Sequence, residues 1–340
     1  MSDQNFTDSL PRRAMRPTAR TWLKHASLLL LTVFTATIAG VLEPFGPKRI
    51  FPDVNPQTTE EILQFILSLP SHYIQLIIES VQLLFTNAEI LAYGLKFSLS
   101  LLFILACHEA GHYIACRIYR VDATLPYFIP TPPLISPAGT LGAFIKILSH
   151  LPSRKATFDI GVAGPIAGFI ALIPISIVGF LTMKFAPVQE NVDVSGSLYF
   201  SDALFTKLLA FFFGLDLTMP IYQNPFYFAA WIGLLVTALN LIPSGQLDGG
   251  HAVYAVLGEK IHGWTGKIAF VVMVLLSAIG LYFYSSPGTI LFTILLGIMM
   301  RVGHPEPLDN SPLDAKRKVV AFLTLLIFIL CFTPFPIQIR

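Results

Sequence analysis

The sequence predicts an all-α, polytopic membrane protein with about six to seven transmembrane helices and a short membrane-associated β-hairpin or loop. Of its 340 residues, 54% are hydrophobic, and the mean hydropathy is +0.68. Only 12% are charged, whereas soluble domains carry roughly 25%. Several apolar runs also approach the roughly 20 residues that a membrane-spanning helix needs.

The strong apolar runs define the predicted spans in chain order. They cover residues 23–42, 94–116, 157–182, 226–244, 266–284 and 318–335. A shorter run at 288–301, bounded by Pro287 and Arg301, is counted as a seventh span. Segment 72–85 is apolar but contains Glu79 and follows Pro70, so we expect a helix lying on the membrane surface.

The loop at 184–225 separates the third and fourth spans and has 42 residues. Ser201 and Asp202 precede an apolar stretch that ends at Phe213, and side chains of these types often cap helices. We therefore expect a capped interfacial helix here, and no room for an inserted peptide-binding domain.

The basic N-terminus predicts the orientation. Arginines and a lysine precede an apolar run that is long for a signal peptide, and that run ends at Glu43 and Pro44 without a small-residue cleavage site. With the N-terminus in the cytoplasm and seven spans, sixteen Lys and Arg lie on the cytoplasmic side and six on the other. This asymmetry follows the positive-inside rule. The size and simplicity of the chain favour a bacterial inner membrane, although an organelle stays open.

Four regions follow from this pattern. They are a basic N-terminal segment (1–22), a first span with an outward loop (23–93), a core (94–260) and C-terminal spans (261–340). The net charge of +2 and the lack of a basic run argue against a nucleic-acid partner. Three cysteines cannot all pair, so no disulfide framework is expected.

A His-Glu-x-x-His motif lies within the second predicted span. His108 and His112 are four residues apart and share one face of a helix, so both imidazoles can bind one metal ion. Glu109 lies beside them, where it can take a proton from a metal-bound water. Ionisable groups at membrane depth are costly and indicate function. Cys107 faces away from the pair and is expected to be a buried apolar residue.

A catalytic zinc site usually has three protein ligands. The fourth strong span runs toward the cytoplasmic side and ends in a segment that contains Asn240, Pro243 and Asp248. We predict that Asp248 is the third ligand. Alternatively, Asp248 could cap the following helix, and His251 is the rival ligand.

Together these motifs resemble the site-2 protease family of intramembrane zinc metalloproteases. The resemblance rests on His108-Glu109-x-x-His112 joined to Asn240-x-x-Pro243-x-x-x-Leu247-Asp248-Gly249, and it extends over about residues 94–335. Gly161-x-x-Gly164-Pro165-x-x-Gly168 opens the third span as in that family. From the residues alone, these glycines are expected to form a helix-packing face.

The resemblance implies a role for each matching residue. His108, His112 and Asp248 would bind one Zn²⁺ per chain, and Glu109 would be the general base. Asn240 would stabilise the oxyanion, although it could equally bond a carbonyl freed by Pro243.

Segment 136–147 resembles the family's Gly-rich, strand-forming loop. Its edge would pair with an unwound substrate, so Gly139, Thr140, Leu141 and Gly142 are the expected substrate-binding residues. The alternative is an ordinary glycine-containing turn.

We therefore expect an enzyme that hydrolyses peptide bonds in or near transmembrane segments of membrane proteins within the lipid bilayer. A non-catalytic zinc-binding chaperone or retention factor for membrane helices is the main alternative. A membrane zinc protease with a distant Glu ligand is less well supported, because the inner spans are poor in Glu. A transporter would leave the motif unexplained.

Overall fold

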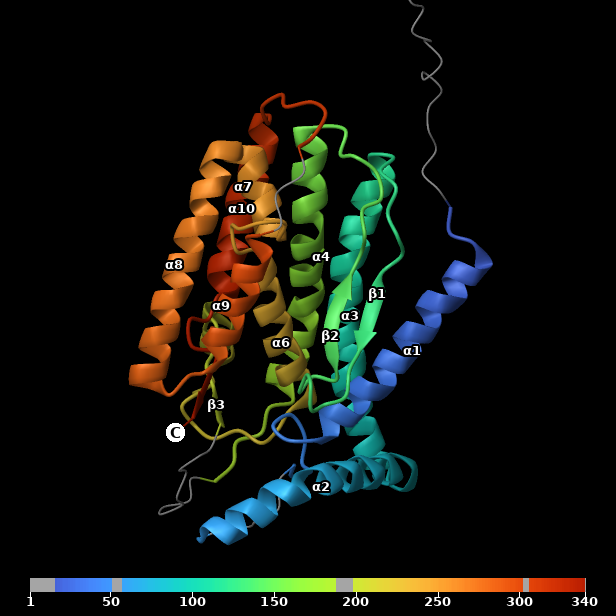
Figure 1. Ribbon diagram of the computed structural model, residues 1–340, viewed down its shortest axis with the longest axis vertical. Helices are drawn as coiled ribbons and strands as arrows, with labels where there is room; N and C mark the ends of the chain where they lie inside the picture. Colours follow the sequence, from blue (N-terminus) through green and yellow to red (C-terminus); the bar gives the residue numbers. More distant parts are fainter. Residues whose placement is uncertain (1–15, 51–56, 188–197, 302–305, 340) are drawn as a thin grey trace, which may run out of the picture.

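Three helices form the centre of the molecule: α3 (Ala88–Ile118), α4 (Arg154–Leu181) and α6 (Pro225–Asn240) (Figure 1). The computed structural model describes residues 16–50, 57–187, 198–301 and 306–339. Glycines let these helices approach closely. A Cβ on Gly111 of α3 would lie 2.3 Å from the carbonyl oxygen of Ala163 in α4, and one on Gly233 of α6 would lie 2.9 Å from Leu172. The predicted core spans are thus packed helices.

Helix α1 (Ala19–Val41) leans against one side of this centre and supports a β-hairpin. Strands β1 (Tyr127–Pro130) and β2 (Thr140–Phe144) pair antiparallel. The Thr35 hydroxyl of α1 donates to the Gly139 carbonyl at 2.7 Å. Gly139 has φ +72°, and a Cβ there would lie 2.4 Å from the Thr35 carbonyl oxygen. The predicted hairpin is confirmed, and α1 holds its turn in place.

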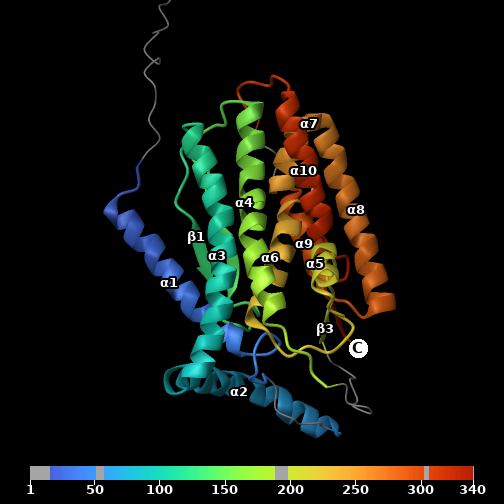
Figure 2. The same ribbon diagram turned by 180° about the vertical axis from the view of Figure 1, so that it is seen from behind.

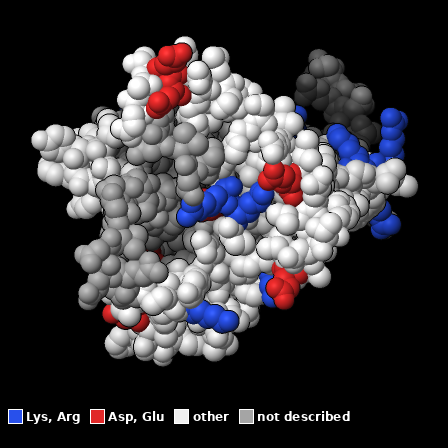
Figure 3. All heavy atoms as spheres, turned by 90° about the horizontal axis from the view of Figure 1, so that it is seen from below, with Lys and Arg blue, Asp and Glu red and all other residues white. Residues whose placement is uncertain are grey.

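Helix α2 (Thr59–Thr86) lies across the end of the bundle in both views (Figures 1 and 2). The segment expected at 72–85 is helical, but α2 is also long and apolar enough to cross a membrane, so its location on the membrane surface stays a prediction. The helix is much longer than expected, however, because a capping box formed by Thr58 and Glu61 starts it and it continues through Pro70. Seen from this end, charged side chains are scattered over a mostly uncharged surface (Figure 3).

The C-terminal helices pack on the other side of the centre. They are α7 (Asp248–Leu257), α8 (Glu259–Tyr284), α9 (Gly288–Met299) and α10 (Ala315–Cys331). Strand β4 (Ile337–Ile339) pairs antiparallel with β3 (Leu198–Phe200), near α5 (Leu204–Phe213). The chain's last described residues therefore bind the loop between α4 and α6.

The expected cap of α5 is wrong. Its N-cap is Ala203, without a side-chain hydrogen bond. Asp202 instead accepts a hydrogen bond from the Tyr227 hydroxyl, and the Ser201 carbonyl accepts one from the Trp231 indole at 2.9 Å. These contacts attach the loop to α6, and tertiary hydrogen bonds have replaced the local cap.

Each of the seven predicted spans contains a helix in the described part of the chain. By length and composition, five helices can cross a membrane, namely α1, α2, α3, α4 and α8. Helices α6, α9 and α10 have 16, 12 and 17 residues, shorter than predicted. The protein is a polytopic, mainly helical membrane protein, while the number of crossings stays a prediction. The N-terminal segment expected at 1–22 lies largely outside the described residues.

A polar cluster joins three helices at the end of the bundle that lies opposite α2. Arg317 of α10 donates to Asp159 of α4 at 2.9 and 2.6 Å, and to the Tyr119 hydroxyl after α3 at 3.0 Å. The Arg317 and Asp159 side chains are 25% and 29% exposed, so water screens the pair only partly.

We expect Arg317→Ala to lower the free energy of unfolding by about 1–3 kcal/mol, because it leaves Asp159 partly buried without its charged donor. Thermal unfolding in detergent measures this. Lys316→Ala, which removes the exposed neighbouring cation, is the control. Equal melting temperatures for the two variants would show that the cluster adds no stability.

Candidate metal centre

Two distant segments bring three potential metal ligands together. His108 and His112 lie one turn apart on α3 and are buried. Asp248 is the first residue of α7, after a tight turn from the end of α6. A Cβ on Gly249 would lie 2.0 Å from the Leu241 carbonyl oxygen, so only glycine fits there. That close contact places Asp248 beside the histidines.

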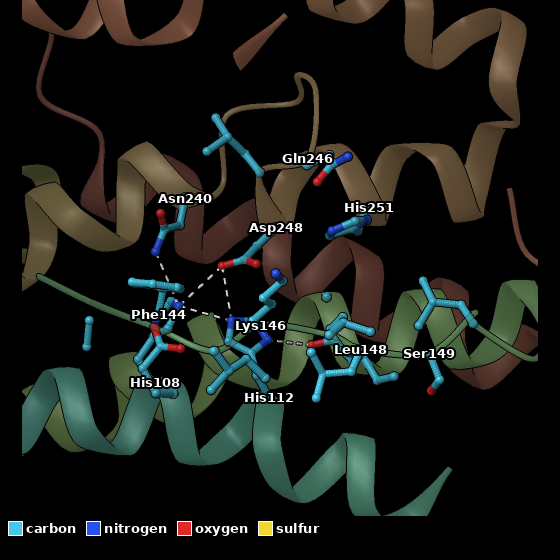
Figure 4. A pocket seen from close by; sticks show the side chains of 18 of the residues that line it. His108, His112, Phe144, Lys146, Leu148, Ser149, Asn240, Gln246, Asp248 and His251 are labelled. Carbon is cyan, nitrogen blue, oxygen red and sulfur yellow. Dashed lines mark hydrogen bonds and ion pairs between the residues drawn. The ribbon is translucent and has the colours of Figure 1, made fainter. Parts of the chain in front are cut away.

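The donor atoms lie at separations that suit one metal ion. The two Nε2 atoms of His108 and His112 are 3.1 Å apart, and Oδ2 of Asp248 lies 3.2 and 3.3 Å from them. Neighbouring ligand atoms around a tetrahedral zinc, with bonds of about 2.05 Å, are about 3.3 Å apart. Figure 4 shows the three side chains converging (Figure 4). The arrangement fits a tetrahedral site with one position left for water or substrate.

A backbone carbonyl orients His112. Its Nδ1 lies 2.7 Å from the Ile160 carbonyl oxygen, so Nδ1 carries the proton and Nε2 is left for the metal. Such a bond is the usual support of a metal-binding histidine, because it defines both tautomer and ring orientation.

The glycine row of α4 forms the floor of the site. A Cβ on Gly164 would lie 2.0 Å from Nε2 of His112, and one on Gly168 would lie 3.1 Å from Cβ of His108. A Cβ on Gly161 would lie 2.7 Å from Cβ of His251. The predicted packing face is confirmed, and what packs against it is a row of imidazoles.

Glu109 and Asn240 also lie at the cluster. Glu109 is only 5% exposed, and its carboxylate accepts a hydrogen bond from the backbone N–H of Ile145. Nδ2 of Asn240, the last residue of α6, lies 3.2 Å from Nε2 of His108. The predicted base and the predicted oxyanion donor thus both stand beside the ligand atoms, although their roles stay predictions.

The rival ligands do not join the cluster. Among the described residues, the only group of metal-ligating side chains that converge within 4.8 Å is His108, His112 and Asp248. His251 lines the same cavity, and burial lowers its pKa to about 4, so it is uncharged at neutral pH. The N-cap of α7 is Leu247, so the alternative that Asp248 caps this helix is wrong.

The centre opens into a cleft with two parts that meet at His108 and Glu109. One part, of about 610 Å³, carries most of the polar groups, and the other, of about 350 Å³, is lined mainly by apolar residues of α6, α9 and β2. Of the expected substrate-binding residues, three line the apolar part: Thr140, Leu141 and Gly142. Gly139 packs against α1 instead.

Sequence reasoning missed how far the strand segment extends along the cleft. Every residue from Ala143 to Leu151 lines the polar part. The signal was present in Ala143, Ile145 and Ile147, whose alternation with more polar or exposed residues indicates an extended strand. The sequence analysis ended the strand-forming segment at residue 147, so the lining residues from Leu148 to Leu151 were not expected.

The chain is similar in sequence to known proteins. A family model described as "Peptidase family M50" matches residues 96–280. The rice protein named "Probable zinc metalloprotease EGY1, chloroplastic" is 29% identical over 314 residues, which cover 90% of this chain and 49% of that protein. The Arabidopsis thaliana protein of the same name is 29% identical over 248 residues, covering 72% of this chain and 42% of that protein. The chain thus spans about half the length, or less, of these relatives.

The matched region contains the complete cluster. It begins before His108 and ends after Asp248, and it includes the glycine row of α4 on which the imidazoles pack. It also covers more than half of the chain. The resemblance expected from the two motifs is therefore confirmed, and this chain belongs to peptidase family M50, the family of the site-2 proteases.

Proposed function

We propose that this protein is a zinc metalloprotease that hydrolyses peptide bonds in or near the transmembrane segments of membrane proteins. The observation that carries the proposal is the convergence of His108, His112 and Asp248 from two segments, at separations of 3.1–3.3 Å. The two histidines lie in α3, Asp248 follows the end of α6, and the buried carboxylate of Glu109 lies beside them. The zinc metalloprotease names of the relatives support the same assignment.

The residues around the centre suit peptide hydrolysis. A zinc ion held there supplies Lewis acidity, which lowers the pKa of water toward ~7 and polarises a carbonyl. Glu109 takes the proton from the attacking water and then delivers it to the leaving amine. The Asn240 amide donates to the carbonyl oxygen as negative charge develops on it. Glu109 is buried, so little water competes for its carboxylate and its electrostatic interactions are strong.

We infer that the substrate is bound as an extended strand. A transmembrane helix keeps its carbonyls in its own hydrogen bonds, so the scissile bond is reached only after local unwinding. The hairpin supports pairing with an unwound segment, because β2 has β1 on one edge and lines the cleft along Thr140, Leu141 and Gly142. The apolar part of the cleft suits side chains that come from within a bilayer.

We also propose an orientation. The excess of Lys and Arg predicts that the N-terminus and the metal centre lie toward the cytoplasmic side. The size and simplicity of the chain favour a bacterial inner membrane, and an organelle membrane is the alternative. The relatives named as chloroplastic are plant proteins, and the chloroplast is the location that the names of those proteins give. Reporter fusions in the loops at both ends of α3 test the orientation.

Zinc stoichiometry tests the proposed site. We expect about one zinc per detergent-purified chain, and loss or clear weakening of binding in Asp248→Ala, since one of three protein ligands is removed. Asp216→Ala, in the loop after α5, is the matched control, because the Asp216 carboxylate accepts hydrogen bonds from Thr218 and lies outside the candidate metal centre. Folding of each variant is checked by thermal unfolding. A well-folded wild type that takes up no zinc from added metal contradicts the proposal.

A further inference from the structure

The cleft beside the metal centre has an uneven charge distribution. Among the described residues that line the apolar part, Glu109 is the one Asp, Glu, Lys or Arg. In the polar part, among the residues that the structure describes, Lys146 is the one lysine or arginine. Its carboxylates are Glu109, Asp248 and, at the exposed rim, Glu306. Figure 4 shows Lys146 extending from the strand segment toward the turn that carries Asp248. A substrate bound in the polar part of the cleft therefore lies near the ammonium group of Lys146.

Hydrogen bonds show which edge of the strand faces the cleft. The Thr124 N–H donates to the Lys146 carbonyl at 3.0 Å, and the Leu148 N–H donates to the Asp122 carbonyl at 2.7 Å. Successive residues of a strand direct their backbone groups to opposite edges. Those of Ile145 and Ile147 therefore point to the other edge, and the bond from Ile145 to Glu109 agrees with this. That edge is where a peptide would pair.

The side chains of the same segment divide between two faces. Ile145 and Ile147 pack into an apolar cluster of α3 and α4. Phe144 and Leu148 are 46% and 50% exposed, and Lys146 between them is exposed too. Neighbouring strands in a sheet place side chains of one face side by side. Every second side chain of a paired peptide would thus lie next to Phe144, Lys146 or Leu148.

We propose that Lys146 selects substrates that carry an acidic side chain at the strand position beside it. Ile145 contacts Glu109, so this position lies within about two residues of the scissile bond, on the side of the polar part. The substrate class is then a transmembrane segment with apolar residues in the apolar part of the cleft and an Asp or Glu within about two residues of the scissile bond, in the polar part. The inference rests on the proposed protease function and narrows its substrates.

Charge reversal tests the inference. Synthetic transmembrane peptides with Asp, Asn or Lys scanned through the positions next to the cleavage point are cleaved by wild type, Lys146→Gln and Lys146→Glu in phosphatidylcholine vesicles. At one position, wild type should prefer Asp over Lys by about two- to fivefold in kcat/KM, the range of a cross-strand charge pair. Lys146→Gln should lose the preference, and Lys146→Glu should reverse it.

Lys155→Glu is the matched control, because it makes the same charge change at the same end of the bundle without lining the cleft. It should keep the wild-type preference. Equal charge preference in wild type and Lys146→Glu overturns the inference while the protease function stands.

Peptide binding distinguishes failure of the Lys146 inference from failure of the protease proposal. Dissociation constants are measured in Glu109→Gln, alone and combined with Lys146→Glu, so that no cleavage is needed. If no peptide is cleaved by the wild type, the protease proposal fails, whereas Asp-dependent binding that reverses with Lys146→Glu still supports the role of Lys146. Binding that ignores the charge of the peptide contradicts it.

Discussion

Glu109→Gln is expected to abolish peptide cleavage while the fold and the zinc content stay unchanged. General-base catalysis contributes about 10²–10⁴-fold to a rate, and the amide of Gln cannot accept the proton. Gln has nearly the same volume as Glu, and its carbonyl oxygen can still accept the N–H of Ile145. Cleavage of a transmembrane peptide, zinc content and melting temperature are measured on the same preparations.

The control for this variant comes from the same helix. Glu89→Gln makes the identical chemical change on α3, but Glu89 is exposed in the first turn, far from the motif. Its cleavage rate should equal that of the wild type. If Glu109→Gln retains turnover, the assignment of the base is wrong.

The measurement also distinguishes an enzyme from a zinc-dependent retention factor. A retention factor would hold a membrane helix equally well in the wild type and in Glu109→Gln, and neither protein would cleave it. A protease would cleave in the wild type and only bind in the variant. The buried carboxylate beside two metal-ligating histidines favours the protease, because burying a charge without a function is costly.

The three residues of the candidate metal centre could be predicted because each has a local signature. His108 and His112 share a helix face through their spacing alone, and Asp248 follows a Pro- and Gly-rich break at the end of a span. The structure brings these residues together as expected. The sequence predicts the His108–His112 motif and the Asn240–Asp248 segment at the same membrane depth, where few other polar groups are expected. This predicted that the two motifs would contact each other.

Features that depend on tertiary contacts were predicted less well. The cap of α5 failed because Asp202 bonds Tyr227, 25 residues away, and no local pattern reports that contact. The extended lining from Ala143 to Leu151 depends on hydrogen bonds to residues 122–124, across the hairpin. Helices α6 and α9 end before the apolar runs that predicted them do, so hydropathy alone overestimates their lengths.

The glycine floor leads to the second large effect, which we expect from Gly164→Ala. The added Cβ would lie 2.0 Å from Nε2 of His112 and 2.5 Å from its Cε1, so the ring has to move. Movement weakens its bond to the Ile160 carbonyl and takes the nitrogen out of position for the metal. Loss of a hydrogen bond that orients a metal-binding histidine costs about 10–100-fold in metal affinity. We expect Gly164→Ala to lower the zinc affinity by about tenfold or more. Competition with a chelator at constant pH measures it.

This effect should be confined to the site, because alanine favours a helix by about 1 kcal/mol over glycine and α4 itself is not weakened. Gly263→Ala on α8 is the control, since a Cβ there meets nothing within 4 Å. The zinc affinity of Gly168→Ala should lie between those of the other two variants, because its added Cβ would lie 3.1 Å from Cβ of His108. A zinc affinity that falls in the order Gly263→Ala, Gly168→Ala, Gly164→Ala would show that imidazole packing on α4 sets the metal geometry. Equal affinities would mean that the ligands hold their positions without that floor.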